Sequence, residues 1–563
     1  MPIDSAWNAY IFRDGKTTVG GPRLVRELGD RLLAIRSFGL AGRAELTDLL
    51  LRAGELECAL QDVTSPAAAL AESITDAIAT SLVSGVPLRS EELSQCARSL
   101  DVPETLQLAT PEGFAYYSLH PLDFVDLVRR FAESRRAAVV GIRSIGTTLG
   151  ALVQSALRAD GRVVERITVR PTGHPYDRVT NLSPVQRQWV ETMRDNGANF
   201  LVVDEGPGMS GSSFLSVGEA LVNTGIPRAR ISFLCSREAD PASLTAPNAA
   251  QRWPSFTAHS TQPTRHLPPR ARHYIAGGIW RANVFSTEDE WPASWRQMER
   301  LKFLSEDGSL RFRFEGFGRF GESVYQRALQ VASAGFGPAP LARDEGFGVY
   351  PMLDGRHMTP ADANADLLKR LAEYCAFRAQ QMPVQVTHTP ELQTMLRFNL
   401  REDFGVELPT RVTELRIERP VIADGRMLPH AWIACGESML KVDSATHGDD
   451  HFFPGPTDIA WDLAGAISEW NLSPEATAFF LNAYRRHSGD DPAERLPAYL
   501  TGYGVFRTAY CKMAAAATAG TAEAERFLRD FTRYHRQTSL LLRSLGAPMH
   551  KTQAMHKSGS QAA

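Results

Sequence analysis

The segment FLVVDEGPGMSGSSF, residues 200–214, constrains the fold more than any other part of the sequence. Its apolar start predicts a buried strand that ends on two adjacent acids, Asp204 and Glu205. A loop of Gly, Pro and Ser follows, and then a helix-like stretch. A Gly-rich turn that opens a helix can present backbone N–H groups and the positive end of the helix dipole to a phosphate. Two carboxylates beside it suit vicinal hydroxyls, so the segment predicts a sugar-phosphate site. An ordinary Gly/Ser turn after a doubly wound strand is the alternative.

A second strand, Gly-rich turn and helix occur upstream, in AAVVGIRSIGTTLGALVQSAL, residues 137–157. The two segments together resemble the signature of the type I phosphoribosyltransferases. The resemblance implies that Asp204 and Glu205 hold the ribose hydroxyls of phosphoribosyl pyrophosphate. It assigns the 5-phosphate to Gly208, Ser210, Gly211, Ser212 and Ser213, and the diphosphate to Gly141, Arg143, Ser144, Gly146, Thr147 and Thr148. The phosphate loop is about one residue longer than the family pattern, so the role of each Ser stays open.

A Pro-rich stretch lies between the two turns, around RPTGHPYDR, residues 170–178. The family carries a mobile flap in this region, and a closed flap would exclude water from a cation-like sugar centre. The resemblance therefore makes Arg170, His174 and Arg178 candidates for diphosphate contact or leaving-group protonation. A solvated surface loop is the alternative interpretation.

A third segment, LKVDSATHGDDHFFPGPTDIAWDLAGAISEW, residues 440–470, places Asp443 at a strand end, fifteen positions before Asp458. It is similar to the C-lobe of the aminoglycoside and choline kinases, which implies that Asp443 binds Mg²⁺ beside the phosphates of ATP. Asp458 and Asp462 begin a helix, and capping explains them as scaffold residues.

The expected partners of Asp443 are less regular. Residues 301–340 resemble an N-lobe hairpin with a DG turn, then a Gly/aromatic loop that would cover phosphates, then a helix. Candidates for the ATP-contacting cation are Lys302, Arg311 and Arg313, and candidates for its carboxylate partner are Glu315 and Glu322. In the catalytic loop DGRMLPHAW, Asp424 stands where the family has His, Arg426 where it has the catalytic Asp, and Ala431 where it has the metal-binding Asn. Either Asp424 acts as base from a shifted register, or this lobe does not transfer phosphate in the usual way.

A dense group of metal-ligand types follows Asp443: His447, Asp449, Asp450 and His451, with His430 nearby in the sequence. Imidazole and carboxylate suit Zn²⁺, Mn²⁺ or Fe²⁺. A solvated polar loop is the alternative, because spacing alone rarely defines a site.

Length and composition predict a cytoplasmic multidomain protein. A chain of 563 residues exceeds a single core, and its formal net charge of −3 gives no support for nucleic-acid binding. No signal peptide or membrane span is predicted, and six scattered cysteines without a CxxC pair suggest reduced thiols. A homodimer is the expected assembly. The expected divisions are a helical domain at 1–125, a parallel-sheet phosphoribosyltransferase-like α/β domain at 126–245, a linker at 246–275, an α+β two-lobed kinase-like domain at 276–545 and a disordered tail at 546–563.

The function expected from the sequence is that of a phosphoribosyltransferase. It would use phosphoribosyl pyrophosphate and Mg²⁺ to form or break an N-ribosidic bond in nucleotide-like metabolism, and the fused kinase-like part would bind ATP. Two alternatives stay open: a non-catalytic sensor of phosphoribosyl pyrophosphate or a nucleotide, and an ATP-dependent small-molecule kinase.

Overall fold

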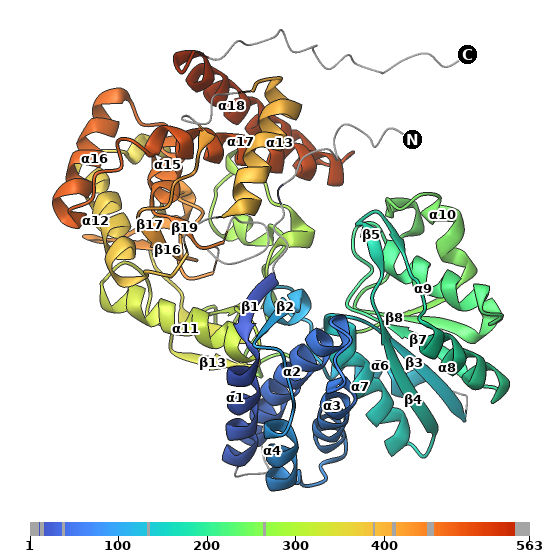
Figure 1. Cartoon of the computed structure of the whole chain (residues 1–563). Coiled ribbons are helices and arrows are strands. Elements are labelled where there is room, and N and C mark those ends of the chain that lie inside the picture. The colour runs from blue at the N-terminus through green and yellow to red at the C-terminus, as the bar shows by residue number, and fades with distance from the viewer. Residues whose placement is uncertain are drawn as a thin grey trace, which may run out of the picture.

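In the computed structural model, strands from residues 136–260 form a five-stranded parallel sheet (Figure 1). The structure describes residues 11, 16–35, 40–131, 135–262, 266–386, 389–407, 413–446 and 455–546. The strands run in the order β4 (Val163–Val169), β3 (Arg136–Ile142), β7 (Asn199–Val203), β8 (Ile231–Cys235), β9 (Thr257–Ser260), all parallel. The chain first builds outward from β3 to β4 and then crosses back to β7, so the order reverses between β3 and β7. Ligands of doubly wound sheets bind at that reversal, outside the carboxyl ends of the strands.

Helices cover both faces of this sheet, which explains why its strands are apolar throughout. Ala138 and Val140 belong to the core that contains residues of α8 (Pro184–Asp195) and α9 (Ser212–Asn223). Their neighbours Ala137 and Val139 belong to a second core with α6 (Asp123–Phe131) and α7 (Ile145–Ala159). Successive side chains of a strand point to opposite faces, and this alternation produces the three layers.

The N-terminal helices share the second core instead of forming one of their own. They are α1 (Gly21–Ala34), α2 (Leu40–Asp62), α3 (Ala68–Ser84) and α4 (Ser90–Arg98), with an antiparallel strand pair β1 (Lys16–Gly20) and β2 (Thr105–Ala109). α2 approaches α7 so closely that a Cβ on Gly54 would lie 2.0 Å from the Thr148 hydroxyl. Arg166 of β4 donates to both oxygens of Glu57 of α2, at 2.7 and 2.9 Å, with both side chains buried.

The segment 246–275, expected to be a linker, carries regular structure. It contains α10 (Ala249–Arg252), the edge strand β9 of the parallel sheet, and β10 (His273–Tyr274). Strand β9 is four residues long and none of its residues is fully buried, so its sequence lacks the apolar signal of the inner strands. Strand β9 therefore makes part of this segment an edge of the parallel sheet, and the described residues between β9 and β10 are irregular.

The remainder of the chain forms two lobes. The first is an antiparallel sheet in the order β10, β11 (Lys302–Leu304), β12 (Leu310–Phe314), β14 (Phe347–Pro351), β13 (Ala342–Asp344), with the helix α11 (Gly318–Ser333) between β12 and β13 in sequence. The DG turn at Asp307 joins β11 to β12, as expected. Phe312, Phe314 and Phe347 join the core of the N-terminal helices and β3. The first lobe therefore packs on the parallel-sheet unit as part of one core.

The second lobe is mainly helical. Its helices are α12 (Ala365–Gln381), α13 (Pro390–Phe404), α15 (Ala460–Glu469), α16 (Pro474–Ser488), α17 (Leu496–Ala517) and α18 (Ala522–Ser544). A small sheet of β15 (Arg356–His357), β17 (Trp432–Cys435) and β18 (Ser438–Lys441), and a pair β16 (Pro420–Val421) and β19 (Thr457–Asp458), face the first lobe. Among the described residues, no helix is long and apolar enough to cross a membrane. Residues 547–563 lie outside the described residues.

Replacing Arg166 with Ala should destabilise the protein by about 3–5 kcal/mol, because it leaves the carboxylate of Glu57 buried without its partner. Arg31→Ala is the matched control. Arg31 pairs with Asp48 while half exposed, so its loss should cost about 1 kcal/mol or less. Calorimetric unfolding of the two variants checks the difference. Equal unfolding temperatures would contradict the view that α2 and β4 belong to one cooperative unit.

Candidate functional site

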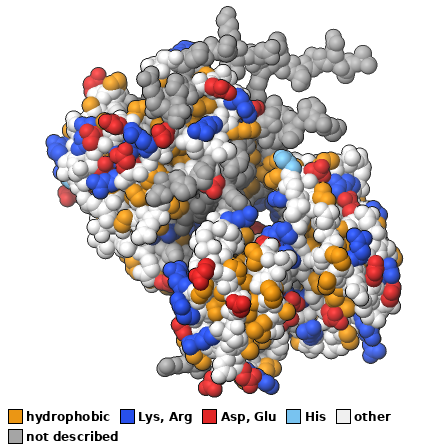
Figure 2. Space-filling view, in the orientation of Figure 1, with side chains coloured by type: hydrophobic (Ala, Val, Ile, Leu, Met, Phe, Trp, Pro, Cys, Tyr) orange, Lys and Arg blue, Asp and Glu red, His pale blue; other side chains and the backbone are white. Residues whose placement is uncertain are grey.

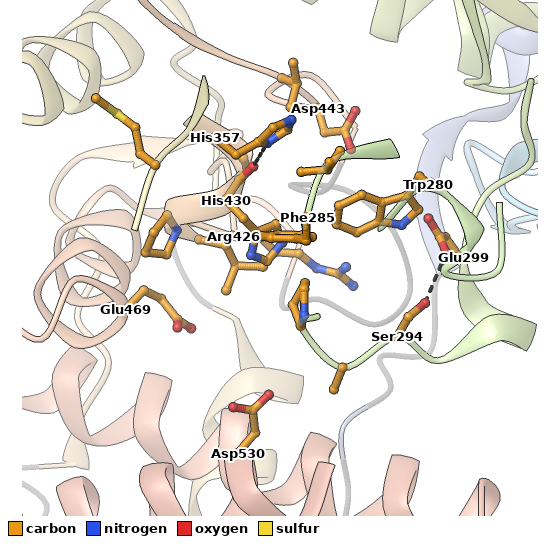
Figure 3. A pocket seen from close by; sticks show the side chains of 18 of the residues that line it. Trp280, Phe285, Ser294, Glu299, His357, Arg426, His430, Asp443, Glu469 and Asp530 are labelled. Carbon is orange, nitrogen blue, oxygen red and sulfur yellow. Dashed lines mark hydrogen bonds between the residues drawn. The ribbon is translucent and has the colours of Figure 1, made fainter. Parts of the chain in front are cut away.

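A cavity of about 1120 Å³ separates the two lobes (Figure 3). Its roof is the antiparallel sheet, its floor is the β17–β18 hairpin, and its far wall is formed by α17 and α18. The segment between β10 and β11, residues 276–300, lines one side with Trp280, Phe285 and Trp295. Arg281 anchors this segment on α18 through two contacts with Glu523, at 2.7 and 3.1 Å. On the face seen in Figure 2, Lys and Arg side chains gather at the hollow where the parts of the molecule meet.

Asp443 lies in the cavity two residues after the end of β18, in a left-handed backbone conformation with φ of 63°. Arg313 and Arg311 of β12 approach one of its oxygens to 3.1 and 3.4 Å, and Lys302 of β11 approaches the other to 4.0 Å. The three candidates for the phosphate-contacting cation therefore converge on the predicted metal ligand. Lys302 is also bound by Glu299 at 2.5 Å, so three cations face two carboxylates here. The remaining positive charge suits a polyanion such as a phosphate chain.

The loop before β17 is held by buried charges. The carboxylate of Asp462, at the start of α15, accepts the backbone N–H groups of Asp424 and Gly425 at 2.8 and 2.9 Å. Asp424 is itself wholly buried and lies 3.0 Å from Nζ of Lys441. Arg378 of α12 approaches both carboxylates and donates to the carbonyl of Ser444, next to Asp443. Asp462 therefore has the scaffold role expected for it. Asp424 cannot serve as a base for a ligand, because no face of it reaches the cavity.

Arg426, which the sequence resemblance aligned with a catalytic Asp, extends into the cavity (Figure 3). Its guanidinium lies 5.9 Å from the ring centroid of Tyr510. Ala431, which the same resemblance aligned with a metal-binding Asn, also lines the cavity. His430 packs beside Trp280, and burial lowers its pKa to about 4. The imidazole is therefore neutral at physiological pH.

The far wall combines acids, arginines and tyrosines. Glu469, at the end of α15, accepts from the hydroxyls of Tyr503 and Tyr534 at 2.6 and 2.7 Å and lies 3.3 Å from Nε of Arg507. Burial acts to raise the pKa of Glu469, but Arg507 and Arg533 outweigh it and the pKa lies below its ordinary value. The ionised carboxylate therefore fixes the arginines of this wall.

Two expectations for the first lobe are wrong. The Gly/aromatic loop at 315–321 does not cover the cavity; it packs on the N-terminal helices, where the N–H of Phe317 donates to the carbonyl of Phe114 at 2.9 Å. Glu322 is half exposed and pairs with Arg343, away from Asp443. The buried Arg327 of helix α11 instead donates a hydrogen bond to the carbonyl of Ala445. The segment 276–300 covers the cavity instead. Sequence reasoning did not predict this role, because the segment contains no recognisable motif.

The second candidate site lies at the reversal point of the parallel sheet. Gly141 of β3 is paired with Val203 of β7, so Arg143 and the acids Asp204 and Glu205 follow neighbouring strand ends. Glu205 accepts the backbone N–H of Gly113 at 2.8 Å, and burial raises its pKa well above its ordinary value. Gly113 belongs to the short helix α5 (Glu112–Ala115). This helix therefore covers Glu205, one acid of the pair.

Arg143 and Arg170 converge at this edge, but on a residue that sequence reasoning did not select. Asp62, the last residue of α2, lies 3.2 Å from Arg143 and 2.5 Å from Arg170. For residues 1–125 the sequence predicted only a helical domain. No local motif marks Asp62, because only the packing of α2 on α7 brings it to the strand ends. Ser144, beside Arg143, has φ of 100°, a strained conformation of the kind concentrated at functional sites.

The serines of the loop meet the expected flap. The flap region forms a hairpin of β5 (Thr172–His174) and β6 (Asp177–Val179), and the hydroxyls of Ser210 and Ser212 both donate to the carbonyl of Pro175 at its tip, at 2.9 and 2.7 Å. A phosphate would have to displace this carbonyl. His174 and Arg178 are turned to the surface of the hairpin, and Arg178 donates to the carbonyl of Gly173.

The other residues assigned here have packing roles or open surroundings. A Cβ on Gly141 would lie 2.3 Å from the carbonyl of Gly146, and a Cβ on Gly146 would lie 2.4 Å from the carbonyl of Val203, so close packing alone requires both glycines. Thr147 is buried. Gly208 is exposed, Ser213 is half-buried, and Gly211 precedes α9 with φ of 68°.

The metal cluster expected at His447, Asp450 and His451 lies outside the described residues. Within the described ranges, no group of three or more His, Cys, Asp or Glu side chains is arranged to hold a metal ion.

The segment 112–117 connects the two candidate sites. Gly113, near its start, donates to Glu205, and Tyr117, at its end, lines the interlobe cavity and contacts Met298. The buried Arg300 donates to the carbonyls of Ala115, Glu315 and Thr446, at 3.3 Å each. One guanidinium thus joins this segment to β12 and to the residues after Asp443.

Comparison with solved structures gives likenesses for part of the chain. A choline/ethanolamine kinase family protein from Mesorhizobium loti matches at 19% identity and a TM-score of 0.32, over 44% of this chain and 89% of that one. A choline kinase from Streptococcus pneumoniae matches at 12% and 0.31, over 42% and 89%. A macrolide 2′-phosphotransferase from Brachybacterium faecium matches at 16% and 0.28, over 41% and 88%. Likenesses at this level carry no functional argument of their own.

The chain matches no protein-family model and no curated protein. Nothing in the comparisons shows a phosphoribosyltransferase domain, so that assignment stays a prediction from the sequence.

Asp204 gives the sheet edge a testable pH dependence. Burial raises its pKa to about 7, against about 3.9 for an unfolded Asp. The stability that comes from its protonated form is fully present below the unfolded pKa and is lost as the pH rises through the folded pKa. Asp204→Asn removes this titration. The unfolding free energy of the variant minus that of the natural protein should therefore rise by about 1–3 kcal/mol between about pH 5 and about pH 8.

Urea denaturation at the two pH values measures this difference. Asp195→Asn is the control, because Asp195 is exposed and its pairing with Arg194 is solvated. A pH-independent difference for Asp204→Asn would show that Asp204 is already ionised in the folded protein.

Proposed function

We propose that the interlobe cavity binds a nucleoside triphosphate and transfers its terminal phosphate to a small molecule. The observation that carries this proposal is the convergence of Lys302, Arg311 and Arg313 on Asp443 at one end of the cavity. Phosphoryl transfer needs little covalent help from the protein; it needs positioned cations around the phosphate oxygens. The cavity also has room beyond Asp443 for an acceptor, between the covering segment 276–300 and helices α17 and α18.

The apolar end of the cavity suits the base of the nucleotide. Leu304 of β11, Pro351 of β14 and the following Met352 and Leu353 line it where the chain passes between the lobes. A planar base placed there directs its phosphates toward Arg313 and Asp443. Arginine can hold two oxygens of one phosphate at once, so Arg313 and Arg311 in place of a lysine favour phosphate binding.

Magnesium fits this donor set when a nucleotide is present. Mg²⁺ in proteins commonly uses one or two carboxylates together with phosphate oxygens and water, and among the described residues Asp443 is the carboxylate beside Arg311 and Arg313. The ion would supply charge neutralisation between the phosphates. Arg311 and Arg313 would then release Asp443 and move to the phosphate oxygens.

Asp443→Asn tests the proposal. Loss of the charge should abolish magnesium-dependent binding of a non-hydrolysable ATP analogue, or weaken it by about tenfold or more, since charge-assisted contacts are worth about 1.5–3 kcal/mol. Isothermal titration calorimetry measures the affinity, and Asp195→Asn is the surface control. Unchanged affinity in Asp443→Asn would exclude this end of the cavity as the phosphate site.

A second candidate function is phosphoribosyl pyrophosphate binding at the edge of the parallel sheet. The observation that favours it is the placement of Arg143, Arg170 and the acid pair at the reversal of strand order. Binding would require the hairpin carbonyl of Pro175 to leave Ser210 and Ser212, and the two arginines to exchange Asp62 for the diphosphate.

Calorimetric titration of phosphoribosyl pyrophosphate with Mg²⁺ tests this candidate. Binding should be lost in the double variant Asp204→Asn/Glu205→Gln if the acids hold the ribose hydroxyls. Asp62→Asn should instead strengthen binding, because it removes the carboxylate that competes for both arginines. Absence of binding in the natural protein and in Asp62→Asn would reject the candidate.

A further inference from the structure

We propose that the acceptor of the transferred phosphate is itself an oxyanion, a carboxylate or a phosphate monoester, and that Arg426 binds it. This inference rests on the function proposed above and names its substrate class. Two observations support it: an arginine, Arg426, occupies the position where a catalytic carboxylate was expected, and no described carboxylate pairs with its guanidinium.

Arg426 is placed to bind an anion from solution. Its backbone N–H donates to the buried carboxylate of Asp424, so the loop that carries it is fixed. Its side chain extends into the middle of the cavity (Figure 3). Among the described residues, its guanidinium makes no hydrogen bond and no ion pair; its contact is the face of Tyr510. A guanidinium in a cavity without a carboxylate partner favours a ligand that brings the negative charge.

The charge of the cavity points the same way. Nine Arg and Lys residues and five Asp and Glu residues line it within the described ranges, although the chain as a whole carries a formal charge of −3. On the far wall, Arg507 and Arg533 are held by Glu469. Arg529 and Arg536 of α18 also line the cavity and form no ion pair with any described residue. Such a wall disfavours a cationic acceptor and attracts an anionic one.

Most acids of the described cavity wall are already paired with a cation or a hydrogen-bond donor: Asp530 lies 3.6 Å from Arg533, while Glu290 is exposed on the covering segment 276–300. Asp424 is fully buried against Lys441, and Glu299 is occupied by Lys302 and by the N–H of Gly278. Glu469 is bound by tyrosines and arginines, as described above. The described imidazoles of the cavity are His357 and His430, and burial lowers the pKa of both, so each is a weak base. An oxyanion acceptor needs no base, because it has no proton to lose.

The step balances without a proton transfer. An oxygen of the acceptor forms a bond to the terminal phosphorus, and the bond from that phosphorus to the oxygen bridging the β-phosphate breaks. The electron pair leaves with the nucleoside diphosphate. The product is an acyl phosphate from a carboxylate, or a phosphoanhydride from a phosphate monoester. Arg426 would hold the acceptor oxygens that do not react and reduce their repulsion with the triphosphate.

Anion binding to the full chain, saturated with Mg²⁺ and a non-hydrolysable ATP analogue, tests the proposal. The analogue fills the nucleotide phosphate site, so inorganic phosphate and succinate, titrated separately by calorimetry, report on the acceptor site; choline is the cationic comparison. At least one anion should bind and choline should not. Arg426→Gln should weaken the anion by about tenfold or more, and Arg426→Lys by less. Arg416→Gln, at an exposed arginine outside the cavity, should change nothing.

The outcomes distinguish failure of the acceptor site from failure of the nucleotide site. Phosphate binding alone identifies a phosphate acceptor and succinate binding alone a carboxylate acceptor. Binding of the analogue with no anion binding, or anion binding unchanged in Arg426→Gln, overturns this inference and leaves the phosphotransferase proposal standing. Failure of the analogue to bind overturns the phosphotransferase proposal itself.

The pH dependence of the transfer rate gives a second test, because it differs between an oxyanion acceptor and an alcohol. With an oxyanion acceptor, the transfer rate should be flat from about pH 7 to about pH 9, whereas an alcohol that needs a base would give a rising profile. Hydroxylamine traps an acyl phosphate as a hydroxamate and leaves a phosphoanhydride intact, so it distinguishes the two products. A rising profile with an alcohol acceptor would contradict the proposal.

Discussion

Two carboxylates and two cations, all buried, hold together the part of the molecule on which the proposed chemistry depends. Asp462 and Asp424 lie between Arg378 and Lys441, each at most 1% exposed. Such a cluster is stable only when complete, because any unpaired member would leave an uncompensated charge in the interior. Its hydrogen bonds reach the backbone of the loop that carries Arg426 and, through Ser444, the backbone beside Asp443. This buried cluster therefore positions two of the charged side chains that face the cavity, Arg426 and Asp443.

The wider architecture joins the cavity to the parallel sheet. One apolar core runs from the N-terminal helices through β3 and α7 to Phe312 and Phe347 of the first lobe. The segment 112–117 crosses the remaining distance, with Glu205 at one end and the cavity at the other. Arg300 ties this segment to β12 and to Thr446. These contacts form a continuous connection between the two candidate sites.

The sequence predicted the elements whose signals are local. Runs of apolar residues bounded by Gly-rich turns identified β3 and β7, and the DG turn identified the β11–β12 hairpin. The sequence also selected Asp443, which lines the interlobe cavity, and Asp462, whose carboxylate holds the backbone of the loop before β17. The magnesium role of Asp443 stays a prediction. What sequence reasoning missed is tertiary. Asp62 has no motif around it, and the covering role of residues 276–300 depends on an anchor to α18 at Glu523. The Gly/aromatic loop has the composition of a phosphate loop, but its packing on the N-terminal helices determines its position.

Hydrogen–deuterium exchange with and without a non-hydrolysable ATP analogue and Mg²⁺ tests the central claim most directly, because it reports on both candidate sites in one experiment. Nucleotide binding between the lobes predicts slower exchange in β11 and β12, residues 302–314, and in residues 441–446. It predicts no comparable protection in the loop at 204–213. Protection confined to residues 204–213, or no protection in either place, would contradict the proposal that the interlobe cavity is the nucleotide site.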